Sequence, residues 1–285
     1  MAGYPIPGGL GTITSVTSST ANNLHNLLIL ACRQTTLNWT FNSDVAPITA
    51  LNGSPTAIEN LAGMRSGSFT FDGLYPRTSP RNGNSGLVTF AAGFVEFCDQ
   101  FTLNIEFGEQ DITPYDGTAI GWRRFMPNDL IEWSGTFTPR ATSGTATALP
   151  TAIDGTGTAA TFKITEDAAN DPAFSGNIVV TGETFSVSHN NQVRPAYSFV
   201  GSGTLTETVG SNLPGILRAS TGTVGASAWD LDSDGVPDIT VLGQTFTNRT
   251  YSGTAFLKSF AMTHNIGQPI RISGEVRYAG AVTTA

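Results

Sequence analysis

Charged side chains are scarce in this sequence of 285 residues, and cysteine and histidine are scarcer still. Lysine, arginine, aspartate and glutamate together make up 13% of the chain, and the formal net charge is −8. That charge argues against a nucleic-acid reader held by a basic patch. Two cysteines and three scattered histidines are too few for a cluster of metal ligands. The chain is nevertheless long enough to bury one or two substantial cores.

Long apolar runs are also missing. The strongest run, residues 27–31, is far too short to span a bilayer. Residues 1–9 lack the basic and apolar blocks of a signal peptide. We therefore expect a chain with no membrane segment that is synthesised in a cytosol.

The sequence is rich in residues that favour strands and turns. Glycine contributes 32 residues, and short runs of valine, isoleucine, phenylalanine and threonine alternate with glycine, proline, asparagine and aspartate. This composition is typical of an all-β protein with many turns. Apolar and polar residues alternate over residues 37–41, which predicts a half-buried strand. Further strands are predicted over residues 66–71, 103–107, 197–200 and 270–273.

One or two short helices are expected within this all-β chain. Residues 54–63 carry a serine suited to the N-cap, a proline suited to the first helical position and a final glycine suited to the stop. Residues 21–34 fit either a helical stripe or a buried strand, and their β-like repeat partner, residues 87–97, favours a strand for both. Loops are predicted over residues 76–86, 108–118 and 141–160.

An internal repeat organises the sequence. Residues 31–39 recur with drift as residues 97–105, and Cys, Gln, Thr, Leu and Asn coincide at the same offset. Cys32 and Cys98 then occupy matched positions, which predicts two buried thiols rather than one disulfide.

The repeat continues downstream of the cysteines. It places His189 and His264 at equivalent positions beside asparagine, so we expect a structural role at a strand end for both. The other matched segments are residues 64–69 with 131–140, 174–176 with 251–253, 184–190 with 259–265, and 197–200 with 270–273.

The order of the matched segments predicts one domain nested in another. The chain runs first half, first half, second half, second half, whereas a tandem duplication would alternate the halves. We predict an inner β-domain of residues 86–207, inserted into an outer β-domain of residues 1–85 and 208–285. Insertion is tolerated where the termini of a domain lie close together at the surface. An exchange of halves between the domains is the alternative.

Residues 230–238 are the sharpest candidate for a ligand site. Acidic residues alternate ahead of Gly235, as in the first half of a calcium loop. The twelfth position is Val241, so the usual bidentate glutamate is missing. The alternative is an acidic, solvated turn between strands. The candidate calcium ligands are Asp230, Asp232, Asp234 and Asp238.

No catalytic or cofactor-binding residues are predicted. The chain has no Gly-x-Ser-x-Gly elbow and no phosphate-binding Gly-Lys-Ser/Thr loop. Residues 122–125, Trp-Arg-Arg-Phe, could stack a sugar or a nucleotide, but a core aromatic beside surface arginines at a subunit contact is favoured. A glycosidase pair is the other candidate, although close acids in a polar loop are more often simply solvated. Its members would come from Glu106, Glu109, Asp111 and Asp116.

The inner segment resembles the tail tube (major tail) proteins of long-tailed bacteriophages. The resemblance covers about residues 95–205 and reaches the outer segments only through the internal repeat. The outer copy lacks the Trp-Arg-Arg-Phe cluster. The segments that carry the resemblance are residues 121–130, 132–137, 161–164, 174–180, 185–189 and 196–203.

The resemblance implies an assembling virion protein rather than an enzyme. Tail tube proteins are β-sandwiches with a flanking helix that assemble into stacked rings, whose inner strands join into one barrel around a lumen. The resemblance thus implies two tail-tube-like β-sandwich domains, in rings of three chains (pseudo-hexameric) or of six. Other tail proteins, such as the tape measure and the terminator, would be partners, and DNA would pass through the lumen without specific binding. Assembly would take place in the host cytoplasm.

Two other functions remain open at this point. One is a different β-type virion protein, such as a head decoration protein or a tail-tip component. The other is a β-rich carbohydrate-binding or hydrolytic protein.

Overall fold

The computed structural model of the chain describes ten segments: residues 36–48, 59–74, 86–90, 95–114, 121–139, 157–164, 173–186, 194–208, 251–252 and 255–284. Every regular element in these segments is a β-strand, which confirms the all-β prediction. The expected helix over residues 54–63 is wrong for residues 59–63, which form the start of β2 and pair with β1. The rest of that segment lies outside the described residues.

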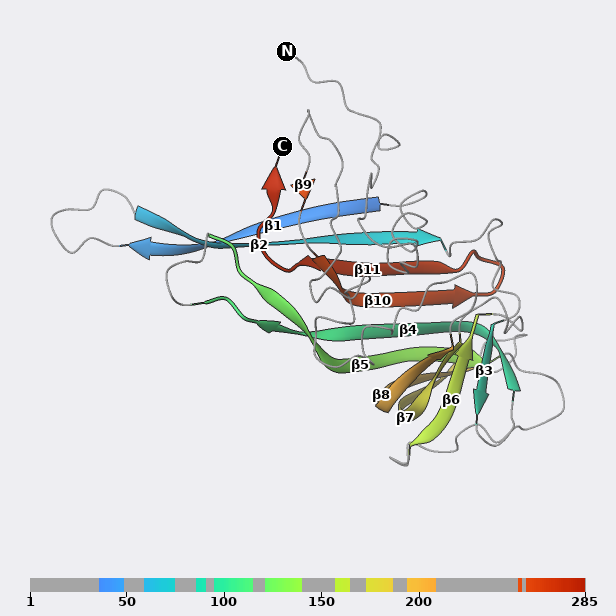
Figure 1. Ribbon diagram of the computed structural model, residues 1–285. Helices are drawn as coiled ribbons and strands as arrows, with labels where there is room; N and C mark the ends of the chain where they lie inside the picture. The colour runs from blue at the N-terminus through green and yellow to red at the C-terminus, as the bar shows by residue number, and fades with distance from the viewer. Residues whose placement is uncertain are drawn as a thin grey trace, which may run out of the picture.

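Twelve strands are described (Figure 1). They are β1 (Thr36–Ile48), β2 (Glu59–Leu74), β3 (Leu87–Phe90), β4 (Val95–Asp111), β5 (Phe125–Pro139), β6 (Thr158–Lys163), β7 (Ala173–Ser186), β8 (Arg194–Thr208), β9 (Tyr251–Ser252), β10 (Ala255–Asn265), β11 (Arg271–Tyr278) and β12 (Thr283–Thr284).

Ten of these strands form one antiparallel sheet in the order β1-β2-β11-β10-β4-β3-β6-β7-β8-β5. A further pairing between β4 and β5 closes the last six strands into a circuit. Strand β4 is the centre of the arrangement, because it pairs with β10, β3 and β5. Strands β9 and β12 form a separate two-stranded sheet. In Figure 1, β1, β2, β11, β10 and β4 run side by side, while β3, β6, β7 and β8 cross below them.

The strands alternate between a buried apolar face and a polar face, as a period of two along each strand requires. The apolar face is fully shielded where the strands meet in the middle of the sheet. Its buried residues include Phe69, Phe71, Leu103, Ile105, Phe260, Met262, Ile272 and Val276. Removing this much apolar and aromatic surface from water is the main source of stability for a chain with so few charges.

Several strands are longer than the sequence patterns predict. Residues 108–111, expected in a loop, belong to β4, and β6 begins inside the loop expected over residues 141–160. Polar or small residues continue these strands because pairing satisfies their backbone groups, and β4 stays paired with β5 through a bulge near Gly108. The single strand predicted over residues 87–97 is wrong, because residues 87–90 form β3, residues 95–97 begin β4, and these two strands pair antiparallel. Residues 21–34 lie outside the described residues.

Tyr197 is expected to control part of the stability at high pH. It is buried in β8 opposite Glu183 of β7. Burial, together with the hydrogen bond to the Glu183 carboxylate and its charge, raises the pKa of Tyr197 to about 12 from 10.0. The folded state therefore holds this proton more tightly, so stability that is present below a pH of about 10 is lost as the pH rises towards about 12.

An ultraviolet titration measures this directly. The Tyr197 phenol should ionise late, and a Tyr197→Phe variant should lose stability less steeply over that pH window. A Tyr197 that titrates at the ordinary pKa of tyrosine would contradict this account.

Candidate functional site

Two sets of four strands share the same order. One set is β1-β2-β11-β10, and the other is β4-β5-β8-β7. The β10–β4 pairing joins the sets into one path of eight strands in which each strand is antiparallel to its neighbours. The first set comes from both ends of the described chain and the second from its middle. The division into an outer and an inner domain remains a prediction.

The strand registers of the two sets also correspond. The repeat matches Phe185 of β7 with Phe260 of β10. Phe185 lies opposite Pro195, and Phe260 lies opposite Gly274. Counting the same distance along β8 and β11 from these two partners matches Phe199 with Tyr278.

An independent match leads to the same pair. The repeat matches Gly135 of β5 with Gly67 of β2 through the shared Ser-Gly-x-Phe. Gly135 lies opposite Phe199 in the β5–β8 register. A Cβ placed on Gly67 would lie 3.1 Å from the ring of Tyr278, and one on Gly135 would lie 2.8 Å from the ring of Phe199. Both routes therefore match Phe199 with Tyr278, so the match of residues 197–200 with 270–273 made from the sequence is wrong.

This register corrects the alignment of the two cysteines. Gly135 lies opposite Leu103, and Gly67 lies opposite Phe41, so Leu103 corresponds to Phe41 rather than to Leu37. Cys98 lies opposite Pro139, whose counterpart Phe71 lies opposite Leu37. Across the bulge between Cys98 and Gln100, Cys98 therefore corresponds to Leu37, and its alignment with Cys32 is out of register. A short motif such as Cys-x-Gln can recur by chance, whereas strand pairing relates every residue of two strands at once. Cys98 is a buried thiol, as predicted, and Cys32 lies outside the described residues.

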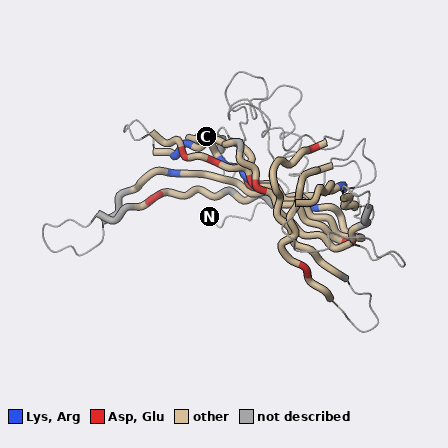
Figure 2. Tube along the Cα trace, turned by 90° about the horizontal axis from the view of Figure 1, so that it is seen from below, with Lys and Arg blue, Asp and Glu red and all other residues tan. Residues whose placement is uncertain are grey.

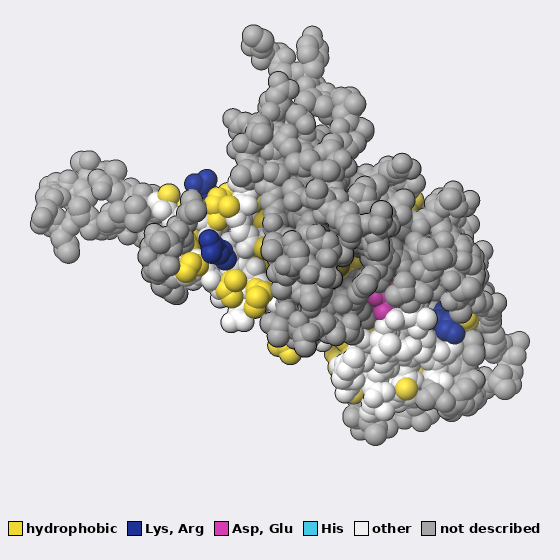
Figure 3. All heavy atoms as spheres, in the orientation of Figure 1, with side chains coloured by type: hydrophobic (Ala, Val, Ile, Leu, Met, Phe, Trp, Pro, Cys, Tyr) yellow, Lys and Arg dark blue, Asp and Glu magenta, His cyan; other side chains and the backbone are white. Residues whose placement is uncertain are grey.

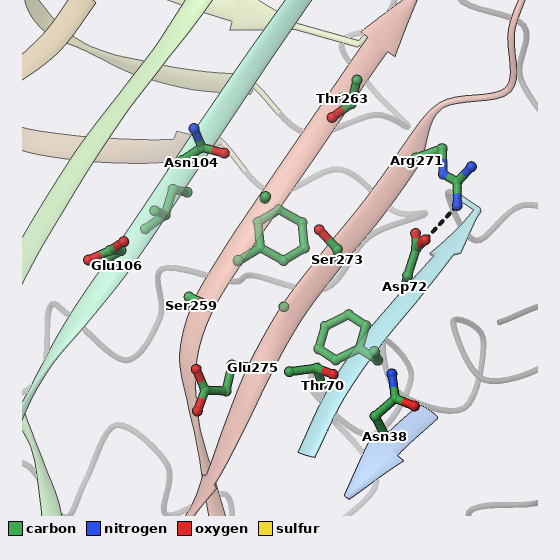
Figure 4. A pocket seen from close by; sticks show the side chains of 15 residues that line it. Asn38, Thr70, Asp72, Asn104, Glu106, Ser259, Thr263, Arg271, Ser273 and Glu275 are labelled. Carbon is green, nitrogen blue, oxygen red and sulfur yellow. Dashed lines mark hydrogen bonds and ion pairs between the residues drawn. The ribbon is translucent and has the colours of Figure 1, made fainter. Parts of the chain in front are cut away.

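The polar face of the joined strands forms an open hollow (Figure 4). Small and polar side chains make up most of its lining. They alternate with buried apolar residues of the same strands, and Phe71, Ile105 and Phe260 also border the hollow. Their cross-strand neighbours are also small or polar, because Thr70 faces Glu275 and Ala261 faces Asn104. The labelled lining residues are Asn38, Thr70, Asp72, Asn104, Glu106, Ser259, Thr263, Arg271, Ser273 and Glu275.

Negative charge predominates on this polar face. Glu106 of β4 lies directly opposite Glu132 of β5, and both side chains are exposed. Two like charges in a cross-strand pair oppose folding, so local stability does not explain their presence. The guanidinium of Arg271 is paired with Asp72, and Glu275 lies 3.8 Å from the Lys258 ammonium.

Among the described residues of this face, Glu106 and Glu132 therefore carry the uncompensated charge. Alternation of apolar and polar residues over residues 103–107 and 131–134 is the sequence signal that could have placed each of them on a polar strand face. Figure 2 shows how thinly charges of both signs are spread along the described trace.

The Trp-Arg-Arg-Phe cluster holds two hairpins together within the chain. The Arg65 N–H donates to the Gly121 carbonyl at 2.8 Å, and the Arg123 N–H donates to the Arg65 carbonyl at 2.7 Å. The Arg65 guanidinium lies 5.4 Å from the centre of the Trp122 ring, a cation–π contact. Arg123 Nη2 lies 2.6 Å from Asp44 Oδ2. The segment thus links the β1–β2 hairpin to the β4–β5 hairpin. Figure 3 shows hydrophobic and basic side chains close together on one described part of the surface.

The acids considered for a glycosidase pair have different surroundings. Glu106 lies on the polar face of the sheet. Glu109 lies 3.8 Å from the Lys258 ammonium and 3.7 Å from Nε of Arg277. Asp111 accepts hydrogen bonds from Thr113 and Arg123, and these hold its pKa below the ordinary value, the Thr113 side chain contributing most. Asp116 lies outside the described residues.

The other residues singled out in the sequence are described only in part. His264 is buried in β10, and its ring stacks on Phe101 at 5.0 Å between ring centres. His189 and the proposed calcium ligands Asp230, Asp232, Asp234 and Asp238 lie outside the described residues. Within the described ranges, no group of three or more His, Cys, Asp or Glu residues is placed to hold a metal ion. No helix in the described part of the chain is long and apolar enough to cross a membrane.

Comparison with known proteins gives matches among solved structures only. No protein-family model and no curated sequence matches the chain. One similar structure comes from the virion of a native gene transfer agent particle, at 15% identity, and another from the tail of an empty particle, at 17% identity. Each match has a TM-score of 0.36 and covers 45% of this chain and 99% of the matched chain. At these values the matches assign no function to this chain.

Proposed function

We propose that this protein is a structural virion protein that assembles into stacked rings and forms the tube of a phage tail. The observation that carries the proposal is the eight-strand antiparallel path, whose polar face bears uncompensated carboxylates. A lone subunit that keeps a long sheet edge open is prone to edge-to-edge association, and closing the sheet into a ring removes the open edges. The Trp-Arg-Arg-Phe segment and the other tube-like motifs of the inner segment support the same proposal.

The charge of the polar face suits a conduit for DNA. Lining a lumen with Glu106 and Glu132 places negative charge towards the phosphates of a passing duplex. Repulsion between these carboxylates and the phosphates keeps the duplex from adhering to the lumen. The same electrostatics, with the opposite sign, makes basic proteins bind DNA. In this proposal DNA passes through without specific recognition, and other tail proteins such as the tape measure and the terminator cap or fill the tube. The tube assembles in the host cytoplasm and functions in the virion.

Three chains suffice for one ring in this proposal. Each chain supplies two four-strand sets with matching order and register, so three chains present six such sets. Identical head-to-tail contacts between chains form a closed ring when their rotation returns to the first chain, and every chain of that ring then has both of its contact surfaces occupied. A ring of six chains is the alternative and would have twice the number of sets.

Assembly of the purified full chain tests the proposed function. Negative-stain microscopy should show rings or stacked tubes with a central channel, and mass photometry should show a species of three chains. A channel of a few tens of ångströms is needed, because the major groove of DNA alone is about 12 Å wide. A chain that stays monomeric at all concentrations, and in the presence of other tail proteins, would contradict the proposal. Binding to a glycan array would favour a carbohydrate-binding function instead.

A further inference from the structure

We propose that neighbouring subunits join by pairing β7 of one copy with β1 of the next, in the register that β10 and β4 use within the chain. This inference rests on the proposed self-assembly and specifies the surface that forms it. The partner is a second copy of this chain. The intrachain β10–β4 junction serves as the template, because β7 corresponds to β10 and β1 corresponds to β4.

The eight-strand path ends at β1 on one side and at β7 on the other, and the directions of these two strands allow antiparallel pairing between copies. Among the described residues, β1 pairs only with β2, and β7 beyond Ile178 pairs only with β8. The strands alternate in direction along the path, and the number of strands is even. A head-to-tail contact therefore places β7 antiparallel to β1 of the next copy, which continues the pattern of the whole sheet.

The β10–β4 junction shows how such a contact buries its side chains. Phe260 of β10 lies opposite Ile105 of β4, with Leu103 and Phe107 as its diagonal neighbours. Phe260 is 1% exposed, and the three β4 residues are at most 5% exposed. Direct and diagonal cross-strand neighbours are the contacts that stabilise a sheet, so these four residues form the centre of the junction.

The corresponding residues at the two open edges are exposed. Phe185, the counterpart of Phe260, is 61% exposed. Val45, the counterpart of Phe107, is 60% exposed, and Phe41, the counterpart of Leu103, is 38% exposed. Transferring the β10–β4 register places Phe185 opposite Ser43 of the next copy, between Phe41 and Val45 of that copy. The β10–β4 junction buries large apolar residues at these positions. Their exposure on β7 and β1 is therefore expected if each edge pairs with a strand of another copy.

Disulfide trapping tests the register. Phe185→Cys and Ser43→Cys chains, each also carrying Cys32→Ser, are mixed, assembled and oxidised. The geometry predicts a cross-link between the two kinds of chain, since opposite residues bring their Cβ atoms within the distance that a disulfide requires. Thr181→Cys replaces Phe185→Cys as the control, because it lies about 13 Å further along the same strand. A chain with both Phe185→Cys and Ser43→Cys should give a ladder of products that ends at the ring size.

A charge placed in the junction tests its contribution to assembly. Phe185→Asp should raise the concentration needed for assembly at least about tenfold, because a buried aromatic anchor is replaced by a desolvated charge. Val200→Asp is the matched control, since Val200 is also exposed, at 44%, but lies away from both edges. Circular dichroism of the variants establishes that each has folded.

The outcomes separate this junction from the proposed function. Rings that form normally but cross-link through Thr181→Cys, or fail to cross-link through Phe185→Cys, overturn the β7–β1 junction and leave the tube function in place. Equal assembly of Phe185→Asp and the unsubstituted chain also overturns the junction. A chain that never assembles overturns both proposals.

Discussion

A Gly201→Ala variant is expected to be strongly destabilised, although it adds a single methyl group. A Cβ at Gly201 would lie 2.0 Å from the indole ring of Trp133, which is 4% exposed. The ring cannot retreat, because a Cβ at Gly176, against the same ring, would lie only 2.6 Å away. The indole N–H also donates to the Gly203 carbonyl at 3.3 Å. Trp133 therefore occupies a slot that two glycines leave open.

The expected cost follows from overpacking a core that cannot relax. Such substitutions typically cost about 1–3 kcal/mol, and Trp133→Ala, which empties the slot, should cost about 3–5 kcal/mol. Urea unfolding followed by circular dichroism measures both. Gly280→Ala is the matched control, because Gly280 corresponds to Gly201 in the other strand set and has no atom within 4 Å of an added Cβ. Equal unfolding midpoints for Gly201→Ala and Gly280→Ala would contradict the close packing of Trp133 against Gly201.

A Glu106→Lys, Glu132→Lys variant is expected to turn the proposed lumen from a surface that repels DNA into one that binds it. The two carboxylates face each other across β4 and β5, and each substitution reverses a charge. Lysines in the assembled ring would contact phosphates, and each contact makes the logarithm of the binding constant fall by about 0.9 per tenfold increase in salt. Fluorescence anisotropy of a labelled duplex, measured with assembled protein over a range of salt concentrations, reports both the affinity and that slope.

The neutral Glu106→Gln, Glu132→Gln variant separates loss of repulsion from gain of attraction. It should assemble normally and bind duplex DNA far more weakly than the lysine variant, because glutamine releases no counterions from phosphates. If the assembled lysine variant binds DNA no better than the unsubstituted tube, these side chains do not line a channel that DNA can enter.

The sequence by itself determined the class of the fold and the existence of matched segments. Alternation is a local property, so residues 103–107 already indicate a strand with one apolar face. The match of Phe185 with Phe260 is also visible in the sequence, because it rests on a run of similar residues. The Trp-Arg-Arg-Phe segment is also visible in the sequence, as a local run of aromatic and basic residues, although its contact with Arg65 and Asp44 was not predicted.

The tertiary structure decided register, strand ends and the identity of the charged face. The capping signals around residues 54–63 are local and favour a helix, but pairing with β1 satisfies the same backbone groups over residues 59–63 in a strand. Matching Cys98 with Leu37 rather than with Cys32 required the pairing of β4 with β5 and of β1 with β2. Glu106 and Glu132 become neighbours only when two strands pair, because cross-strand contacts join residues whose spacing along the chain carries no periodic signal.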